Sequence, residues 1–236
     1  MNEITKAILE YIRRNRVSSV EVADALGKEG VLEGLNSLSP GHHVAGVLSY
    51  IPAYGESNWP VHDAAQHIPE ERIVYVDAIG CGERAIFGDI VAKYLLLYKR
   101  SLAVVVNGRV RDVHRLRKEE YPIWTKGGSP LGCFNHNVAL DDETSAVIDA
   151  RRAALEGSII VCDDSGCTVI EPSRLTDETL KRLEFIELQE DIWYFCIDTL
   201  KLSTFETICE KAYLKHRELL PETLREQLEA MEKALK

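Results

Sequence analysis

Long hydrophobic runs are missing from this sequence. The longest, such as residues 94–98, fall far short of the ~20 apolar residues that a membrane-spanning helix needs. The N-terminal residues 1–16 mix acidic and basic side chains and lack the continuous apolar segment of a signal peptide. We therefore expect a soluble, cytoplasmic protein that does not enter a membrane.

Positive charge is also in short supply. The chain has 28 Lys and Arg residues against 38 Asp and Glu residues, which gives a net charge of −10. Such a chain repels the phosphate backbone of a nucleic acid unless its basic residues cluster. The densest basic segment, residues 109–118, is interrupted by Asp112 and followed by Glu119 and Glu120, as in a solvated helix face. We expect no nucleic-acid partner.

Several catalytic and metal-binding motifs are absent as well. The sequence contains no G-x-S-x-G, H-E-x-x-H or P-loop motif. Of the six cysteines, only Cys162 and Cys167 are close together, and no second cysteine or histidine pair lies near them to complete a zinc site. Because no export signal is found, we expect reduced thiols, most of them buried as small apolar side chains.

Strands and helices alternate along much of the chain. This order is typical of α/β layers with partly parallel strands. β-branched runs predict strands at residues 43–51, 72–77, 102–106 and 122–126. A hairpin with an Asp-Asp-Ser-Gly turn is expected over residues 158–172, whereas residues 131–155 show no decisive pattern.

Helices are expected at both ends of the chain. Apolar spacing predicts helices over residues 3–15 and 18–26, and Thr176 is expected to cap a long helix that ends near residue 201. Charged helical stretches follow. We therefore expect an α/β domain over residues 1–175 and a helical arm over residues 176–236, which packs on the same domain or on a neighbouring subunit.

A glycine pattern follows the strand at residues 72–77. In 80-GCGERA-85, Gly80, Gly82 and Ala85 satisfy the G-x-G-x-x-[GA] pattern of dinucleotide-binding folds, and a buried helix is expected to follow, up to residue 100. The next strand ends in Asn107, where an acidic residue would be needed for a ribose hydroxyl. A tight turn between strand and helix is the simpler interpretation, and a dinucleotide-binding oxidoreductase is a minor alternative.

Gly88 and Asp89 form a second candidate feature in the same segment. A glycine opens backbone amides to a ligand and a helix N-terminus favours anions, so residues 88–91 could hold a carboxylate or phosphate. Asp89 could equally serve only as a helix cap or dipole partner. The sequence pattern leaves both interpretations open.

Arg111 and Asp112 follow the strand 102-LAVVV-106 after a short spacer. Ligands of open α/β sheets bind at the carboxyl ends of strands. The planar fork of Arg111 suits a carboxylate and the oxygens of Asp112 suit a hard cation, a pair that fits an α-keto acid bound to Mg²⁺ or Mn²⁺. Alternatively, Asp112 caps the next helix and Arg111 pairs with a surface acid.

Several segments together resemble the RraA-like family in order and spacing. They are 22-VADALGKEGV-31, 84-RAIFGDIVAKY-94, 107-NGRVRDV-113, 121-YPIWTKGGSP-130 and 157-GSIIVCDDSGCTVIEP-172. That family includes the regulator of ribonuclease activity A and metal-dependent 4-hydroxy-4-methyl-2-oxoglutarate aldolases. The resemblance implies a swivelling β/β/α domain, here with a C-terminal helical arm, assembled as a homotrimer or homohexamer with active sites between subunits.

The resemblance also implies roles for the charged residues. Asp112 would be the ligand of Mg²⁺ or Mn²⁺, Arg111 would grip the pyruvyl carboxylate, and Asp89 would hold metal-bound water. A glutamate from a neighbouring subunit belongs to the family's site, and Glu190 is its best match here.

Backbone groups complete the implied pyruvate site. They are Gly88 and the amides of Ile90 and Val91. The chain departs from the family pattern at Arg109, where a small residue is usual, and in 133-CFNHN-137. These departures bear on the substrate more than on the metal site.

The first functional hypothesis is therefore a divalent-metal-dependent lyase. It would act on an α-keto acid by retro-aldol cleavage or by decarboxylation of oxaloacetate, with the metal as a Lewis acid that stabilises a pyruvate enolate. The alternative is a non-catalytic regulator that binds a protein partner such as a ribonuclease. Fold alone does not separate these hypotheses, because function lies in the site.

Overall fold

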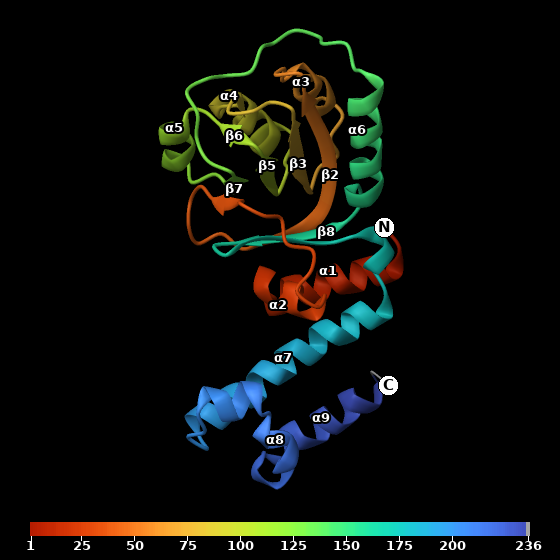
Figure 1. Ribbon diagram of the computed structural model, residues 1–236, viewed down its shortest axis with the longest axis vertical. Helices are drawn as coiled ribbons and strands as arrows, with labels where there is room; N and C mark the ends of the chain where they lie inside the picture. Colours follow the sequence, from red (N-terminus) through yellow and green to blue (C-terminus); the bar gives the residue numbers. More distant parts are fainter. Residues whose placement is uncertain (235–236) are drawn as a thin grey trace.

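A seven-stranded mixed sheet forms the centre of the protein in the computed structural model, which describes residues 1–234 (Figure 1). Four parallel strands occupy its middle, in the order β7 (Ile123–Thr125), β5 (Ala103–Asn107), β3 (Arg72–Ile79) and β2 (Val44–Tyr54). The edges are antiparallel: β1 (Asn36–Ser37) pairs with β7, and the hairpin of β8 (Ile159–Asp163) and β9 (Gly166–Ile170) extends the sheet beyond β2. The predicted strands and hairpin are confirmed.

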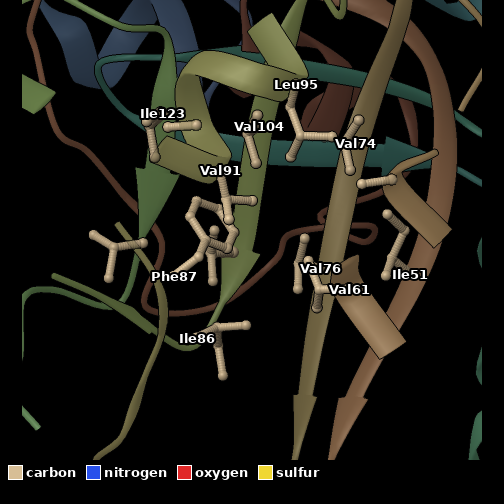
Figure 2. Packing of buried hydrophobic residues seen from close by; sticks show 14 of the residues in the cluster. Ile51, Val61, Val74, Val76, Ile86, Phe87, Val91, Leu95, Val104 and Ile123 are labelled. Carbon is tan, nitrogen blue, oxygen red and sulfur yellow. The ribbon is translucent and has the colours of Figure 1, made fainter. Parts of the chain in front are cut away.

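Helices cover both faces of this sheet, which explains why its central strands are almost continuously apolar. On β3, Val74 and Val76 belong to the cluster formed with α3 (Trp59–Ala65) and α4 (Asp89–Lys93). Figure 2 shows this layer, in which Val91 of α4 lies close to Val104 of β5. The opposite face of β3 packs with α6 (Asp142–Leu155), a helix within the segment that the sequence pattern left unassigned.

A separate two-stranded ribbon lies at the carboxyl ends of the parallel strands. It pairs β4 (Ala85–Phe87) in parallel with β6 (Arg109–Val110). The prediction of a helix directly after the glycine turn was therefore wrong: the helix begins only at Asp89 and continues as a π-helical turn over Tyr94–Tyr98.

This strand also overturns the dinucleotide interpretation. That motif requires a strand, a turn and then the first turn of a helix around its third small residue. Ala85, the third small residue, is instead the buried first residue of β4. The glycines of 80-GCGERA-85 thus form a connection between two strands, β3 and β4, and not the start of a helix.

A buried ion pair fixes the carboxyl ends of β3 and β5. Asp77 is fully buried and accepts hydrogen bonds from Arg151 of α6 at 2.8 Å, from Asn107 at 2.8 Å and from the Tyr50 hydroxyl at 2.9 Å. A buried carboxylate needs such partners, because leaving it unpaired costs several kcal/mol. Asn107 stands where a dinucleotide-binding fold would need an acidic residue. Here its side chain bonds to Asp77 and so holds the end of β5 just before β6 begins.

The helical arm leads away from the sheet (Figure 1). The helices α1 (Glu3–Asn15) and α2 (Ser19–Ala25) pack against the β8–β9 hairpin and contact α7 (Asp177–Asp198), whose N-cap is Thr176 as predicted. Beyond them, α8 (Ala212–Lys215) and α9 (Glu222–Ala234) enclose a hydrophobic cluster of their own with the second half of α7. Across residues 1–234, none of the helices combines the length and apolar character needed to span a bilayer.

Candidate functional site

The β4–β6 ribbon brings two segments that are distant in sequence to one cleft. The Arg111 amide donates to the Phe87 carbonyl at 2.9 Å, which sets the residues after β6 beside those after β4. Gly88 and Asp89 therefore face Arg111 and Asp112 across a cleft of about 200 Å³. Ile90 and Val91 also line this cleft, so six of the residues singled out from the sequence meet here.

Asp112 has a backbone conformation that few residues other than glycine adopt. Its φ of 56° is left-handed, and although it precedes α5 (Val113–Lys118), its side chain makes no capping hydrogen bond. Its Oδ2 lies 3.4 Å from the Asp89 amide nitrogen and 3.6 Å from Arg111 Nε. The simple capping role is therefore not the one that this carboxylate plays.

Two glycines make room for the charged pair. A Cβ at Gly88 would lie 1.9 Å from Asp112 Oδ2, and one at Gly132 would lie 2.9 Å from an Arg111 guanidinium nitrogen. The first contact is far closer than van der Waals distance. The walls of the cleft are thus shaped around the Arg111 and Asp112 side chains.

Asp89 is the first residue of α4 and pairs with a second arginine. Arg115 donates to its Oδ2 at 2.9 Å. This hydrogen bond, together with the charge of Arg115 and contact with Asp112, lowers the pKa of Asp89 below its ordinary value. Asp89 consequently stays ionised to a lower pH than an ordinary aspartate.

The cleft also contains polar residues that the sequence analysis missed. Asn58, His62, Cys133 and Asn135 line the cleft. Asn58 is held by a hydrogen bond from its side-chain amide to the Ile86 carbonyl at 2.9 Å. Asn58 and His62 lie at the start of α3, whereas Cys133 and Asn135 lie in a loop. No periodicity marks these positions, and only the unfamiliar segment 133-CFNHN-137 pointed to this part of the cleft.

The donors in the cleft suit a hard divalent cation. Asp112 and Asp89 supply carboxylate oxygens, and Mg²⁺ ordinarily keeps several waters beside one or two carboxylates. Within residues 1–234, no three His, Cys, Asp or Glu side chains converge into a site built from protein ligands alone. A cation at Asp112 would therefore take most of its ligands from water and substrate oxygens.

Glu190 lies far from this cleft along its own chain, on α7 of the arm. Burial raises its pKa, and the nearby carboxylates of Glu21, Asp24 and Glu187 raise it further. The structure thus does not bring Glu190 together with Arg111 within one subunit. Its assignment to a neighbouring subunit's site stays a prediction.

An apolar surface adjoins the cleft on the outer side of α4. Ile90, Tyr94, Leu97 and Tyr98 are exposed there, with Ile90 78% and Leu97 55% exposed. They line a groove of about 680 Å³ that shares Asp89 and Ile90 with the cleft. Apolar patches of this kind typically mark interaction surfaces. We name Ile90, Tyr94, Leu97 and Tyr98 the α4 face.

The family model described as RraA-like, Aldolase/RraA, matches residues 19–169, which is most of the chain. The chain belongs to the RraA-like family. That family includes both lyases and ribonuclease regulators, and its aldolases generally depend on a divalent metal. The swivelling α/β fold expected from the resemblance is confirmed.

Solved structures agree with this fold. An uncharacterised protein from Pseudomonas syringae pv. tomato matches with a TM-score of 0.65 at 20% identity, covering 86% of this chain and 92% of that one. RraAS2 of Streptomyces coelicolor, described as an unusual member of the RNase ES inhibitor RraA protein family, matches with a TM-score of 0.60 at 22% identity, covering 78% and 96%.

One curated relative is similar in sequence. Protein DlpA of Legionella pneumophila is 28% identical over 184 residues, which cover 74% of this chain. The match spans only 29% of DlpA, so this chain corresponds to less than a third of that protein.

The acidic contact between α7 and α2 predicts a pH-dependent stability. Because the folded-state pKa of Glu190 is raised, its contribution to stability is complete below the pKa of the unfolded chain and is lost as the pH rises through the folded pKa. We expect Glu190→Gln to unfold at a higher temperature than the wild type at pH 8 and at the same temperature at pH 4, as measured by circular dichroism.

Glu178→Gln is the matched control on the same helix. Glu178 forms an exposed pair with Arg182, so its loss should change stability by less than about 0.5 kcal/mol. Equal thermal unfolding curves for Glu190→Gln and the wild type at pH 8 would contradict the raised pKa of Glu190.

Proposed function

We propose that the protein is a divalent-metal-dependent lyase that releases pyruvate from an α-keto acid. The reaction is retro-aldol cleavage of a substrate like 4-hydroxy-4-methyl-2-oxoglutarate, or decarboxylation of oxaloacetate. The observation that carries the proposal is the convergence of Arg111 and Asp112 with Gly88 and Asp89 in one cleft. Membership of a family that includes lyases supports it.

In this proposal each side chain has a distinct task. Arg111 binds the substrate carboxylate through its planar fork. Asp112 holds Mg²⁺ or Mn²⁺, which when bound supplies a Lewis acid for the keto oxygen. Asp89, kept ionised by Arg115, orients a water molecule that can exchange a proton with the substrate.

The backbone at the start of α4 completes the binding of the pyruvyl unit. The first amides of a helix have no partner within the helix. The Ala92 amide donates to the Gly88 carbonyl at 3.1 Å, so the amides of Ile90 and Val91, in the first turn of α4, have no acceptor within the helix backbone and are the proposed donors to the carboxylate. Gly88 itself contributes by leaving room for Asp112.

We further propose that the active protein is a homotrimer or homohexamer whose neighbouring subunit covers the α4 face. Its apolar residues lie at the edge of the cleft, so a subunit packed on them would also wall the substrate site. Glu190 of a neighbouring subunit is the proposed proton donor, since its raised pKa suits a group that delivers a proton nearer to neutral pH.

A non-catalytic regulator is the second candidate. RraAS2, one of the structural neighbours, is described as belonging to a family of RNase ES inhibitors. In that case the α4 face would bind the partner protein and the charged cleft would be dispensable. Substituting Arg111 or Asp112 separates the candidates. The substitution abolishes the activity of a lyase, whereas a regulator with the same substitution still binds its partner protein.

Pyruvate release tests the lyase directly. With Mg²⁺ or Mn²⁺, the wild type is expected to release pyruvate from at least one of the two keto acids in a coupled assay, and to stop when EDTA is added. Asp112→Asn should lower kcat/KM by about 100-fold or more, because a metal ligand is weakened. Arg111→Lys should raise KM by about 10-fold, since it loses the two-point grip on the carboxylate.

Arg109→Ala is the matched arginine control. The sequence pattern linked Arg109 to the substrate, but the side chain pairs with Glu83 and does not line the cleft, so the variant should keep wild-type activity within about twofold. Failure to turn over any keto acid in a broad panel, or full activity of Asp112→Asn, would contradict the proposal.

Gly88 and Gly132, which make room for Asp112 and Arg111, predict two losses of activity of different size. Gly88→Ala places a methyl group 1.9 Å from Asp112 Oδ2 and must displace the carboxylate. A misplacement of about 1 Å costs roughly 100-fold in rate, so kcat should fall by about that factor. Gly132→Ala meets the flexible end of Arg111 and should lose only about 10-fold. The reverse order of severity, in variants with unchanged melting temperatures, would argue against this geometry.

A charged side chain introduced into the α4 face tests the proposed subunit interface. Leu97→Glu buries a carboxylate in the subunit contact and is expected to turn the oligomer into a monomer at micromolar concentration, measured by light scattering after gel filtration. Leu219→Glu, an exposed leucine on the arm, should leave the oligomer intact. A wild-type monomer, or an unchanged oligomer for Leu97→Glu, would overturn the proposed contact.

A further inference from the structure

Two thiols lie side by side at the wall of the cleft. Cys133 is partly exposed and lines the cleft next to Gly132, the glycine beside Arg111, whereas Cys81 is 1% exposed. The Cys81 thiol donates to the Ile79 carbonyl at 3.7 Å, and Cys133 packs against the buried cluster that contains Cys81. The interaction between the two thiols raises the pKa of Cys81 and lowers that of Cys133. The proposed lyase chemistry uses neither sulfur.

Backbone hydrogen bonds hold the two cysteines in this contact. The Arg84 amide donates to the Cys81 carbonyl at 3.1 Å and closes a turn. The Cys133 amide donates to the Ala85 carbonyl at 3.0 Å, and Arg84 donates to the Gly132 carbonyl at 2.9 Å. One short turn therefore carries Cys81 and also anchors the loop that carries Cys133.

Arg84 adds a positive charge beside the thiols. Its guanidinium lies 4.4 Å from the centre of the Phe134 ring, next to Cys133 in sequence, and its charge contributes to the lowered pKa of Cys133. Glu56, which pairs with Arg84 at 3.0 Å, partly offsets this effect, and the pKa of Cys133 is lowered on balance. A cation near a thiol favours the thiolate, which is the form that reacts with peroxides. The accessible thiol is thus the activated one, and the buried thiol stands behind it.

We propose that Cys133 and Cys81 form a peroxide-sensitive dithiol, a modification site in which Cys133 reacts first and Cys81 resolves it to a disulfide. The Cys133 thiolate attacks one oxygen of a hydroperoxide, an S–O bond forms and the O–O bond breaks. The leaving oxygen takes up a proton and departs as water or an alcohol. The product at Cys133 is a sulfenic acid.

The second step joins the two sulfurs. The Cys81 sulfur attacks the sulfenic sulfur, the S–O bond breaks, and the hydroxyl leaves as water with the proton of the Cys81 thiol. In total, two thiols lose two electrons and two protons, and a hydrogen peroxide molecule becomes two waters. A dithiol reductant reverses the disulfide by thiol exchange.

The disulfide would act on the cleft through Gly132. This glycine lies so close to Arg111 that a methyl group on it would contact the guanidinium. Drawing Cys133 toward Cys81 shifts Gly132 and so changes the wall against which Arg111 rests. Loss of lyase activity on oxidation follows from this contact and rests on the proposed function, whereas the thiol chemistry does not.

The test is mass spectrometry of the full-length protein after treatment with about one to ten equivalents of hydrogen peroxide, with digestion under non-reducing conditions. The expected product is a peptide pair crosslinked through Cys81 and Cys133 that dithiothreitol removes. Cys81→Ser should instead trap the sulfenic acid at Cys133, detected as a dimedone adduct, and Cys133→Ser should give neither product. Cys209→Ser, which removes an exposed thiol on the arm, should leave the crosslink unchanged.

Two results would overturn the proposal. One is oxidation confined to Cys209 or to the buried Cys162 and Cys167 pair on the hairpin; the other is survival of both Cys81 and Cys133 as free thiols in the wild type. Because this readout requires no substrate, it decides the dithiol even if no keto acid is turned over. If pyruvate release is found, peroxide should abolish it and dithiothreitol restore it in the wild type.

Discussion

The pairing of β4 with β6 is the constraint on which the candidate site depends. The two strands are only three and two residues long, yet they join segments separated by more than 20 residues of helix and strand. Their register places Gly88 against Asp112 closely enough that no side chain fits between them. A slip of one residue would turn alternate side chains to the other face of the ribbon and separate the charged pair from α4.

Much of the supporting fold could be predicted, because its signals are local. β-branched runs mark β3 and β5, the Asp-Asp-Ser-Gly turn marks the hairpin, and Thr176 marks the start of α7. β4 could not be predicted, since 85-AIF-87 is short and merges with the helical periodicity that follows. The polar wall at Asn58 and Cys133 depends on contacts between distant loops, which leave no periodic trace in the sequence. The division of the chain at residue 175 stays a prediction.

The electrostatics of the cleft differ from those of the whole chain. A net charge of −10 repels anions at long range, yet Arg111, Arg115 and Arg84 gather around the cleft. Arg115 is held by Asp89 at 2.9 Å and Arg84 by Glu56 at 3.0 Å, and neither lines the cleft, whereas Arg111 lines it and has only a longer contact of 3.6 Å with Asp112. Arg111 is therefore the cation best placed to meet a carboxylate. The same wall carries the Cys81 and Cys133 pair, so substrate recognition and thiol oxidation would share one surface.

The central claim is that Asp112 and Arg111 bind a cation and a keto acid together. The most direct measurement is a crystal structure with Mn²⁺ and oxalate, using the anomalous scattering of manganese to locate the ion. The account predicts one anomalous peak beside the Asp112 carboxylate, with oxalate between that peak and the Arg111 guanidinium. A manganese peak elsewhere, or oxalate bound away from Arg111, would contradict it.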